Sequence, residues 1–233
     1  MGEVFFNGPE GRIEGRMHNS EDPDAPSVLL LPPDPRHGGT MNNTVVYNAF
    51  RSFADQGMTV LRINYRGVGR SEGKFDNGLG ELADSATALD WLQTNNISSQ
   101  FFWVCGFSFG SWLAMQLLMR RPEISGFIAI SPPVNKFDFN FLSPCPAPGM
   151  FIHGTNDSIT KESAVNSLYD RLTKQSSHEI LYEIVNGADH FYRSKLDELQ
   201  EIITSYVVNR LDSDIDTDYL MRPTKKRRKP NTV

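Results

Sequence analysis

Short apolar runs alternate with longer amphipathic stretches along most of this 233-residue chain, and this alternation restricts the possible folds more than any other feature. The apolar runs are residues 27–31, 58–64, 101–105, 126–130, 149–152 and 179–185. The amphipathic stretches, with apolar residues at helical spacing, are residues 42–56, 79–95, 109–120, 161–174 and 195–210. Helices that alternate with nearly continuous apolar strands cover both faces of a parallel sheet. We therefore predict an α/β fold with a doubly wound, mostly parallel sheet.

Both ends of the chain depart from this alternation. Residues 3–6 and 11–17 flank a turn-rich pentapeptide and predict an antiparallel hairpin ahead of the parallel strands. Residues 212–233 are highly charged and have almost nothing to bury. We therefore predict one domain over 1–211, followed by a disordered tail over 212–233.

Composition and charge disfavour several classes of partner. The net charge of −5 favours neither nucleic acid nor an anionic membrane, and the basic run from Lys225 to Lys229 is only a weak signal for nucleic-acid contact. No apolar stretch is long enough to span a bilayer, and the first twenty residues lack the core of a signal peptide. Cys105 and Cys145 have neither a disulfide framework nor metal-ligand spacing. We expect a cytoplasmic protein without a metal or cofactor.

The most informative motif is Gly106-Phe107-Ser108-Phe109-Gly110, between an apolar run and an amphipathic stretch. A serine at a sharp strand-to-helix turn has a strained backbone, and small residues two positions before and after it relieve the crowding. Its hydroxyl then lies at a helix N-terminus, where the backbone N–H of Phe109 can face a developing oxyanion. We predict that Ser108 is a nucleophile; a structural serine in a tight turn is the alternative.

The sequence resembles the α/β-hydrolase family over residues 1–211, and within it the small esterases that have little or no lid. Besides the serine motif, the resemblance rests on Gly38-Gly39-Thr40-Met41-Asn42-Asn43 and on Asn64-Tyr65-Arg66-Gly67-Val68-Gly69-Arg70-Ser71-Glu72-Gly73. It implies an α/β-hydrolase fold without a large cap domain and a triad in the order Ser, acid, His. The second stretch is not a dinucleotide-binding motif, because Glu72 stands where that motif needs a glycine.

His190 is the predicted base, because it lies on a short loop between the last apolar run and the final amphipathic stretch. His37, in the loop after the first parallel run, is the only serious competitor. The other histidines lie in the hairpin region, before the last strand and at the end of the preceding strand: His18, His178 and His153. We expect His153 to shape the loop that carries the acid.

Asp157 is the predicted acid, because it follows the apolar run 149–152, at the sheet edge where ligands of open α/β sheets bind. A carboxylate there would fix the tautomer of the imidazole and stabilise the imidazolium. Asp189 is adjacent to His190 and would have difficulty reaching its Nδ1. Asp138, after the previous strand, is a weaker rival.

The second oxyanion donor is expected in the loop after residues 27–31. In Pro32-Pro33-Asp34-Pro35-Arg36 only Asp34 and Arg36 carry a backbone N–H. The resemblance points to the N–H of Asp34, although similar sequences carry His-Pro-His-Pro here. The carboxylate of Asp34 would oppose an oxyanion unless it turns away or pairs with Arg36.

Residues 131–148 are the whole connection between two strands where larger relatives insert a helical lid, so we expect an open site. Phe137, Phe139 and Phe141 alternate there with polar residues. They either form an apolar wall of the site or pack on the sheet, and the sequence favours neither arrangement.

These features predict a serine hydrolase that cleaves small carboxylic esters through an acyl-enzyme intermediate. Acyl thioesters and dipeptide amides are alternative substrates, since the same groups cleave all three. The alternative from another class is a catalytically silent, hydrolase-like binding protein, and the altered loop at Asp34 is its only support.

Overall fold

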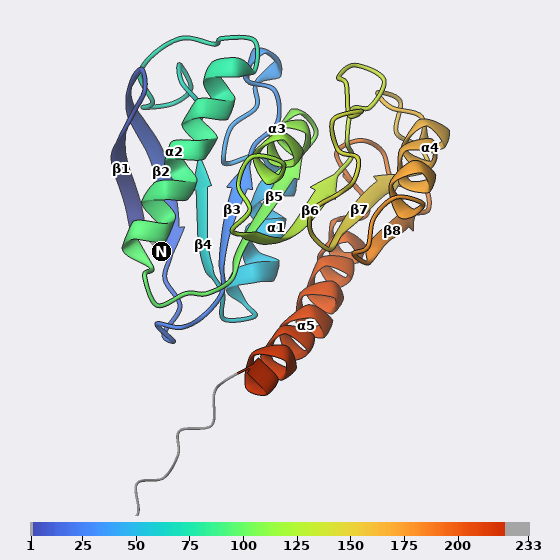
Figure 1. Cartoon of the computed structure of the whole chain (residues 1–233). Helices are drawn as coiled ribbons and strands as arrows, with labels where there is room; N and C mark the ends of the chain where they lie inside the picture. The colour runs from blue at the N-terminus through green and yellow to red at the C-terminus, as the bar shows by residue number, and fades with distance from the viewer. Residues whose placement is uncertain (1, 222–233) are drawn as a thin grey trace, which may run out of the picture.

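A computed structural model of the chain describes residues 2–221, with side chains described up to residue 212. It contains one eight-stranded sheet with the order β1-β2-β4-β3-β5-β6-β7-β8 (Figure 1). The strands are β1 Gly2–Gly8, β2 Gly11–His18, β3 Ser27–Leu31, β4 Thr59–Ile63, β5 Phe102–Phe107, β6 Ile124–Ile130, β7 Gly149–Gly154 and β8 Ile180–Val185. The helices are α1 Thr44–Ala54, α2 Leu79–Asn95, α3 Phe109–Leu118, α4 Glu162–Thr173 and α5 Leu196–Met221, with a short 3-10 helix, η1, at Pro35–His37.

The sheet is mostly parallel, as predicted. Strands β1 and β2 form an antiparallel hairpin, and β2 joins the rest of the sheet through an antiparallel pairing with β4. From β4 to β8 every neighbouring pair is parallel. All residues of β3 and β4 are buried, because helices cover both faces of the sheet.

Two layers of helices enclose the sheet (Figure 1). Helices α2, α3 and α4 pack on one face through side chains such as Leu89, Leu113 and Leu172. Helices α1 and α5 pack on the opposite face, where Phe53 and Ile203 are fully buried. Among residues 2–221, none of the helices combines the length and the hydrophobicity that a bilayer crossing requires.

The order of the strands determines where a site can form. The chain leaves β3 for β4 on one side and later returns to β5 on the other, so the connections diverge at β3. The loops that follow β3 and β5 therefore separate and leave a crevice at the carboxyl ends of these strands. The loops after β6, β7 and β8 border the same edge of the sheet, since all these strands are parallel.

Helix α5 extends to Met221, past the domain end that we predicted at residue 211. Its described core side chains, including Leu199, Ile203 and Val207, all precede that position. Once a helix has been nucleated, each added residue gains one backbone hydrogen bond. The helix can therefore continue beyond its last packed side chain. Residues 222–233, with the basic run, lie outside the described residues, and the domain boundary stays a prediction.

Candidate active site

Ser108 lies at a sharp turn between β5 and α3. Its backbone has φ 53° and ψ −120°, a conformation that is strained for a residue with a side chain. The turn needs glycine on both sides. A Cβ atom on Gly106 would lie 2.2 Å from the carbonyl oxygen of Gly110, and one on Gly110 would lie 2.2 Å from that of Leu31. The Ser108 N–H donates to the carbonyl of Ile130 at 2.9 Å, which ties the strained residue to β6.

A continuous chain of hydrogen bonds joins the three residues predicted as nucleophile, base and acid. The Oγ of Ser108 lies 3.0 Å from Nε2 of His190, and Nδ1 of His190 lies 2.7 Å from Oδ2 of Asp157. An ionised carboxylate can only accept, so the proton of the neutral imidazole is on Nδ1. Nε2 is then free to accept the hydroxyl proton of Ser108.

The Asp157 carboxylate is held ionised by its partners. Burial by itself would raise the pKa of this carboxyl group, but the hydrogen bond to His190 and two backbone N–H donors outweigh it, and the pKa of Asp157 is lowered. These donors are the N–H groups of Ile159 and Thr160, at 2.8 Å and 2.9 Å from Oδ1. The carboxylate is therefore fixed in both charge and orientation.

The loop that carries His190 is held by ring contacts to the imidazole and by hydrogen bonds of Tyr192, two residues later. The imidazole packs on the buried ring of Phe107, with 5.2 Å between the ring centroids, and the ring of Phe191 meets it edge-on at 5.2 Å. Two residues on, the buried hydroxyl of Tyr192 lies 3.1 Å from Ser131 Oγ and donates to the carbonyl of Ile152. The imidazole therefore has little freedom to leave Ser108.

His153 lies behind the acid, a contact that sequence reasoning did not identify beyond a role in shaping the loop. Its Nε2 lies 2.9 Å from the carbonyl oxygen of Thr160, and because a carbonyl only accepts, Nε2 carries the proton. Its Nδ1 lies 3.9 Å from Oδ2 of Asp157 and has no hydrogen-bond partner within the described residues. The His153 side chain is fully buried, and this burial lowers the pKa of its imidazole.

Two backbone N–H groups are positioned as candidate oxyanion donors. The N–H of Phe109 is at the first residue of α3, and the N–H of Asp34 precedes the 3-10 helix η1. Neither N–H donates to an acceptor among residues 2–221. Both residues border the same cavity as Ser108, although their donor role remains a prediction.

The carboxylate of Asp34 forms an ion pair with Arg36. It accepts from the backbone N–H of Arg36 at 2.9 Å and from the guanidinium Nε and Nη2 at 3.1 Å and 2.7 Å. Partial burial opposes ionisation of the Asp34 carboxyl group, but the hydrogen bonds from Arg36 outweigh it and its pKa is lowered. The guanidinium also packs over the ring of Phe75, and Tyr65 holds the loop through a 3.2 Å hydrogen bond to the carbonyl of Pro32.

A cavity of about 450 Å³ opens above Ser108 and His190. Phe109, Phe137 and Phe191 contribute aromatic walls to it. The predicted phenylalanine stripe is divided between the two roles that we considered. Phe137 lines the cavity and stacks on Trp112 at 4.5 Å, whereas Phe139 is buried in the core against the sheet. Between β6 and β7 the described chain contains no helix that could cover the cavity.

The rival candidates have other partners. Asp189 accepts from the backbone N–H of Arg193 and pairs with its guanidinium. Asp138 accepts from the N–H of Asn140. His37 borders the cavity, but its side chain is 76% exposed and its Nδ1 lies 3.5 Å from Oδ2 of Asp34. The ring of His18 meets the ring of Phe50, in α1, edge-on, and His178 lies just before β8.

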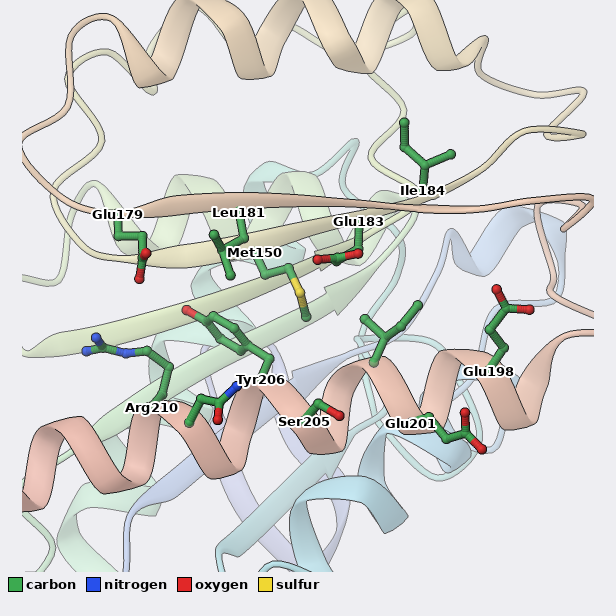
Figure 2. Close-up of a pocket in the computed structure, with 12 residues that line it drawn as sticks. Met150, Glu179, Leu181, Glu183, Ile184, Glu198, Glu201, Ser205, Tyr206 and Arg210 are labelled. Carbon is green, nitrogen blue, oxygen red and sulfur yellow. The ribbon is translucent and has the colours of Figure 1, made fainter.

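A larger cavity, about 670 Å³, lies between β8 and α5 (Figure 2). Glu183 projects into it from β8 and Glu179 from the position just before that strand, and Glu201 and Ser205 border it from α5. It contains no histidine or cysteine among its described lining residues. Ser205 therefore has no imidazole beside it among the described lining residues, and the smaller cavity is the candidate active site.

Similar proteins are known by sequence and by structure. Residues 36–146 match the family model of serine aminopeptidases, S33. The chain is 56% identical over 212 residues to an uncharacterized protein of Rickettsia prowazekii, strain Madrid E, with 89% of each chain covered. A crystal structure from Agrobacterium tumefaciens, of a protein of unknown function considered an α/β hydrolase, is 48% identical with a TM-score of 0.88, covering 91% of this chain and 97% of that chain. A serine hydrolase without a lid from Xanthomonas campestris is 28% identical with a TM-score of 0.79, covering 89% and 94%.

Proposed function

Because the chain belongs to the α/β-hydrolase family, among its serine hydrolases, we propose that it cleaves small carboxylic esters through an acyl-enzyme intermediate. The observation that carries the proposal is the hydrogen-bonded chain from Ser108 Oγ through His190 to Asp157. In this proposal Ser108 is the nucleophile, His190 the general base and Asp157 the group that orients the imidazole.

The proposed reaction has two halves. As Ser108 Oγ bonds to the ester carbonyl carbon, its proton passes to Nε2 of His190 and the carbonyl oxygen becomes an oxyanion. The ester C–O bond then breaks, and His190 delivers the proton to the departing alkoxide oxygen, which leaves an acylated serine. A water molecule attacks the acyl carbon, gives a proton to His190 and releases the acid, while the serine oxygen recovers its proton. Asp157 stabilises the imidazolium in both halves.

The N–H groups of Phe109 and Asp34 are the proposed oxyanion donors. The pairing of Asp34 with Arg36 supports an active enzyme over a silent binding protein, because the pair brings no net charge close to the developing oxyanion. An unpaired carboxylate there would have been the main argument for a silent scaffold.

The family model's description raises aminopeptidase activity as a second candidate. Cleavage next to a free amino terminus needs an acceptor for the substrate's ammonium group. The carboxylate among the described lining residues is that of Asp34, and Arg36 already occupies it. This arrangement favours esters over peptides with a free amino terminus.

An active-site probe tests the proposal directly. A fluorophosphonate should label the purified chain at one peptide that contains Ser108, identified by mass spectrometry. Ser108→Ala should abolish the labelling, and Ser205→Ala, in the cavity of Figure 2, is the matched control that should retain it. Butyryl esters, thioesters and anilides with the same acyl group then rank the three substrate classes. Absence of labelling, or labelling at another serine, would contradict the assignment.

A further inference from the structure

The charged side chains that border the cavity of the candidate active site do not balance. Besides His190, the charged or titratable side chains that border its cavity are Asp34, Arg36, His37 and Lys136. Asp34 and Arg36 cancel each other through their hydrogen-bonded ion pair. No carboxylate among the described side chains pairs with Lys136. The side chains that border the cavity therefore carry an excess of positive charge, although the whole chain carries a net charge of −5. The carboxylate of Asp157 does not border the cavity, because it is buried behind His190 and bound to the imidazole.

The loop that carries Lys136 is held in place on both sides. The N–H groups of Lys136 and Phe137 donate to the carbonyl of Pro133, at 2.9 Å and 3.1 Å, which forms a tight turn. The side chain of Asn135 donates to the carbonyl of Ile159 at 2.7 Å and accepts from the hydroxyl of Thr160 at 2.8 Å. The base of the lysine side chain is thus fixed relative to the acid loop, while its ammonium group remains exposed to solvent.

The cation lies next to the apolar wall of the cavity. Phe137 follows Lys136 in sequence, and its ring is fixed between Trp112 at 4.5 Å and Phe109 at 5.6 Å. Pro133 and Ile159 add further apolar surface to the same cavity. A ligand that matches this arrangement has a short apolar body and an anionic end.

We propose that Lys136 binds a carboxylate of the substrate, so that the preferred esters are monoanions with an apolar body between the ester and the carboxylate. This inference rests on the proposed function of the same site. The carboxylate belongs either to the acyl part or to the alcohol part of the ester, and the two positions are separate arms of the test. The net negative charge of the chain opposes the binding of an anionic ester only weakly, because at physiological ionic strength charges more than about 8 Å away are largely screened.

The kinetic test compares anionic esters with neutral counterparts. One pair is mono-p-nitrophenyl glutarate and its methyl ester; the other is 4-acetoxybenzoate and its methyl ester. The ratio of kcat/KM between anionic and neutral ester is measured for each pair. For at least one pair, Lys136→Gln should lower this ratio about fivefold, as expected for a solvent-exposed ion pair, and Lys136→Arg should retain it. Lys174→Gln removes the same charge at the far end of α4 and should leave the ratio unchanged.

The competing outcomes are distinct. If the ratio is the same in the Lys136→Gln variant for both pairs, or falls equally in Lys174→Gln, the inference is wrong. If no ester is cleaved at all, the proposed function fails, and a binding measurement still tests Lys136. In that case 3-phenylpropanoate should slow fluorophosphonate labelling of Ser108 at lower concentration than 3-phenylpropanamide does. Loss of that difference in Lys136→Gln supports the inference, and its persistence overturns it.

Discussion

Arg36 donates two guanidinium hydrogen bonds, at 3.1 Å and 2.7 Å, to the carboxylate of Asp34, two residues earlier in the loop after β3. The same carboxylate accepts a hydrogen bond from the backbone N–H of Arg36, so that Asp34 is the N-cap of the 3-10 helix η1. The N–H of Asp34 is a proposed oxyanion donor, so an acidic side chain lies close to the negative charge that the reaction creates. Arg36 supplies the compensating charge.

Removing this compensation should slow the chemical step. At an effective dielectric constant of about 20, an unpaired carboxylate some 6 Å or more from an oxyanion costs about 1–3 kcal/mol. We therefore expect Arg36→Gln to lower kcat for p-nitrophenyl acetate by about 10- to 100-fold with little change in KM.

The double variant Asp34→Asn/Arg36→Gln provides the control, because it removes both charges and keeps a side-chain acceptor for the start of η1. Steady-state kinetics of the single and double variants form the test. Recovery of most of the lost kcat in the double variant would identify the cause as charge. If the double variant is as slow as Arg36→Gln, the arginine acts by shaping the loop.

The three hydrogen-bonded residues should behave as one unit. Ser108→Ala is expected to lower kcat by about 10⁶-fold, and His190→Ala by a similar factor, because neither group works without the other. The double variant should be no slower than either single variant. Asp157→Asn should cost about 10⁴-fold. Steady-state hydrolysis of p-nitrophenyl acetate, after subtraction of the uncatalysed rate, measures each loss of kcat, and additive losses for Ser108 and His190 would contradict a shared role.

How much the sequence could predict depended on how local each constraint is. Ser108 was identifiable because the strained turn needs glycine on both sides, and that requirement is visible within five residues. The places of His190 and Asp157 followed from the ends of predicted strands. By contrast, the hydrogen-bond partner of Asn135 is Thr160, 25 residues away on the loop that carries Asp157, and no sequence pattern predicts this contact.

The aromatic stripe and helix α5 mark two further limits of the sequence. The alternation of Phe137 and Phe139 with polar residues left open whether these rings line the site or pack on the sheet, and only the packing decides which ring enters the core. The charge of residues 212–221 argued against order, yet the backbone of α5 continues through them. Tertiary contacts upstream nucleate such a helix, and local composition does not report them.

Burial of His153 should make stability depend on pH. Its folded-state pKa is lowered from the usual 6.5, so the unfolded chain binds the proton more readily. The contribution of neutral His153 to the free energy of unfolding is complete above about pH 6.5, and it decreases as the pH falls from there toward the folded-state pKa of the imidazole. Asp157, His190, Glu162 and the carbonyl of Thr160 are the groups that face the imidazole.

His153→Gln is the appropriate comparison, because its amide can still donate toward the carbonyl of Thr160 without titrating. Urea unfolding at pH values from 5 to 8 should give the wild type a steeper loss of unfolding free energy below pH 6.5 than the variant. Parallel pH profiles would mean that His153 does not titrate differently in the two states.

Truncation after Leu211 should leave stability and activity nearly unchanged. The described core contacts of α5 come from Leu199, Ile203, Tyr206 and Val207, with Leu211 packed at the edge, so the core of the helix remains. The expected change in unfolding free energy is below about 1 kcal/mol, and kcat/KM for p-nitrophenyl butyrate should be retained. A larger loss in denaturant unfolding would show that residues after 211 contact the domain.

The open cavity should favour short acyl chains and simple saturation kinetics. Residues 131–148 contribute the ring of Phe137 to the cavity wall, while Phe139 is buried beneath the loop, so the apolar wall is short. Each methylene adds about 0.8 kcal/mol only while it remains covered by apolar surface. Activity on p-nitrophenyl esters should therefore peak at acyl chains of about two to six carbons, without a jump at the solubility limit of the substrate. Rates measured across the series from acetyl to palmitoyl, above and below that limit, provide the test. A preference for palmitoyl, or activation at a lipid–water interface, would require a mobile cover and contradict the open site.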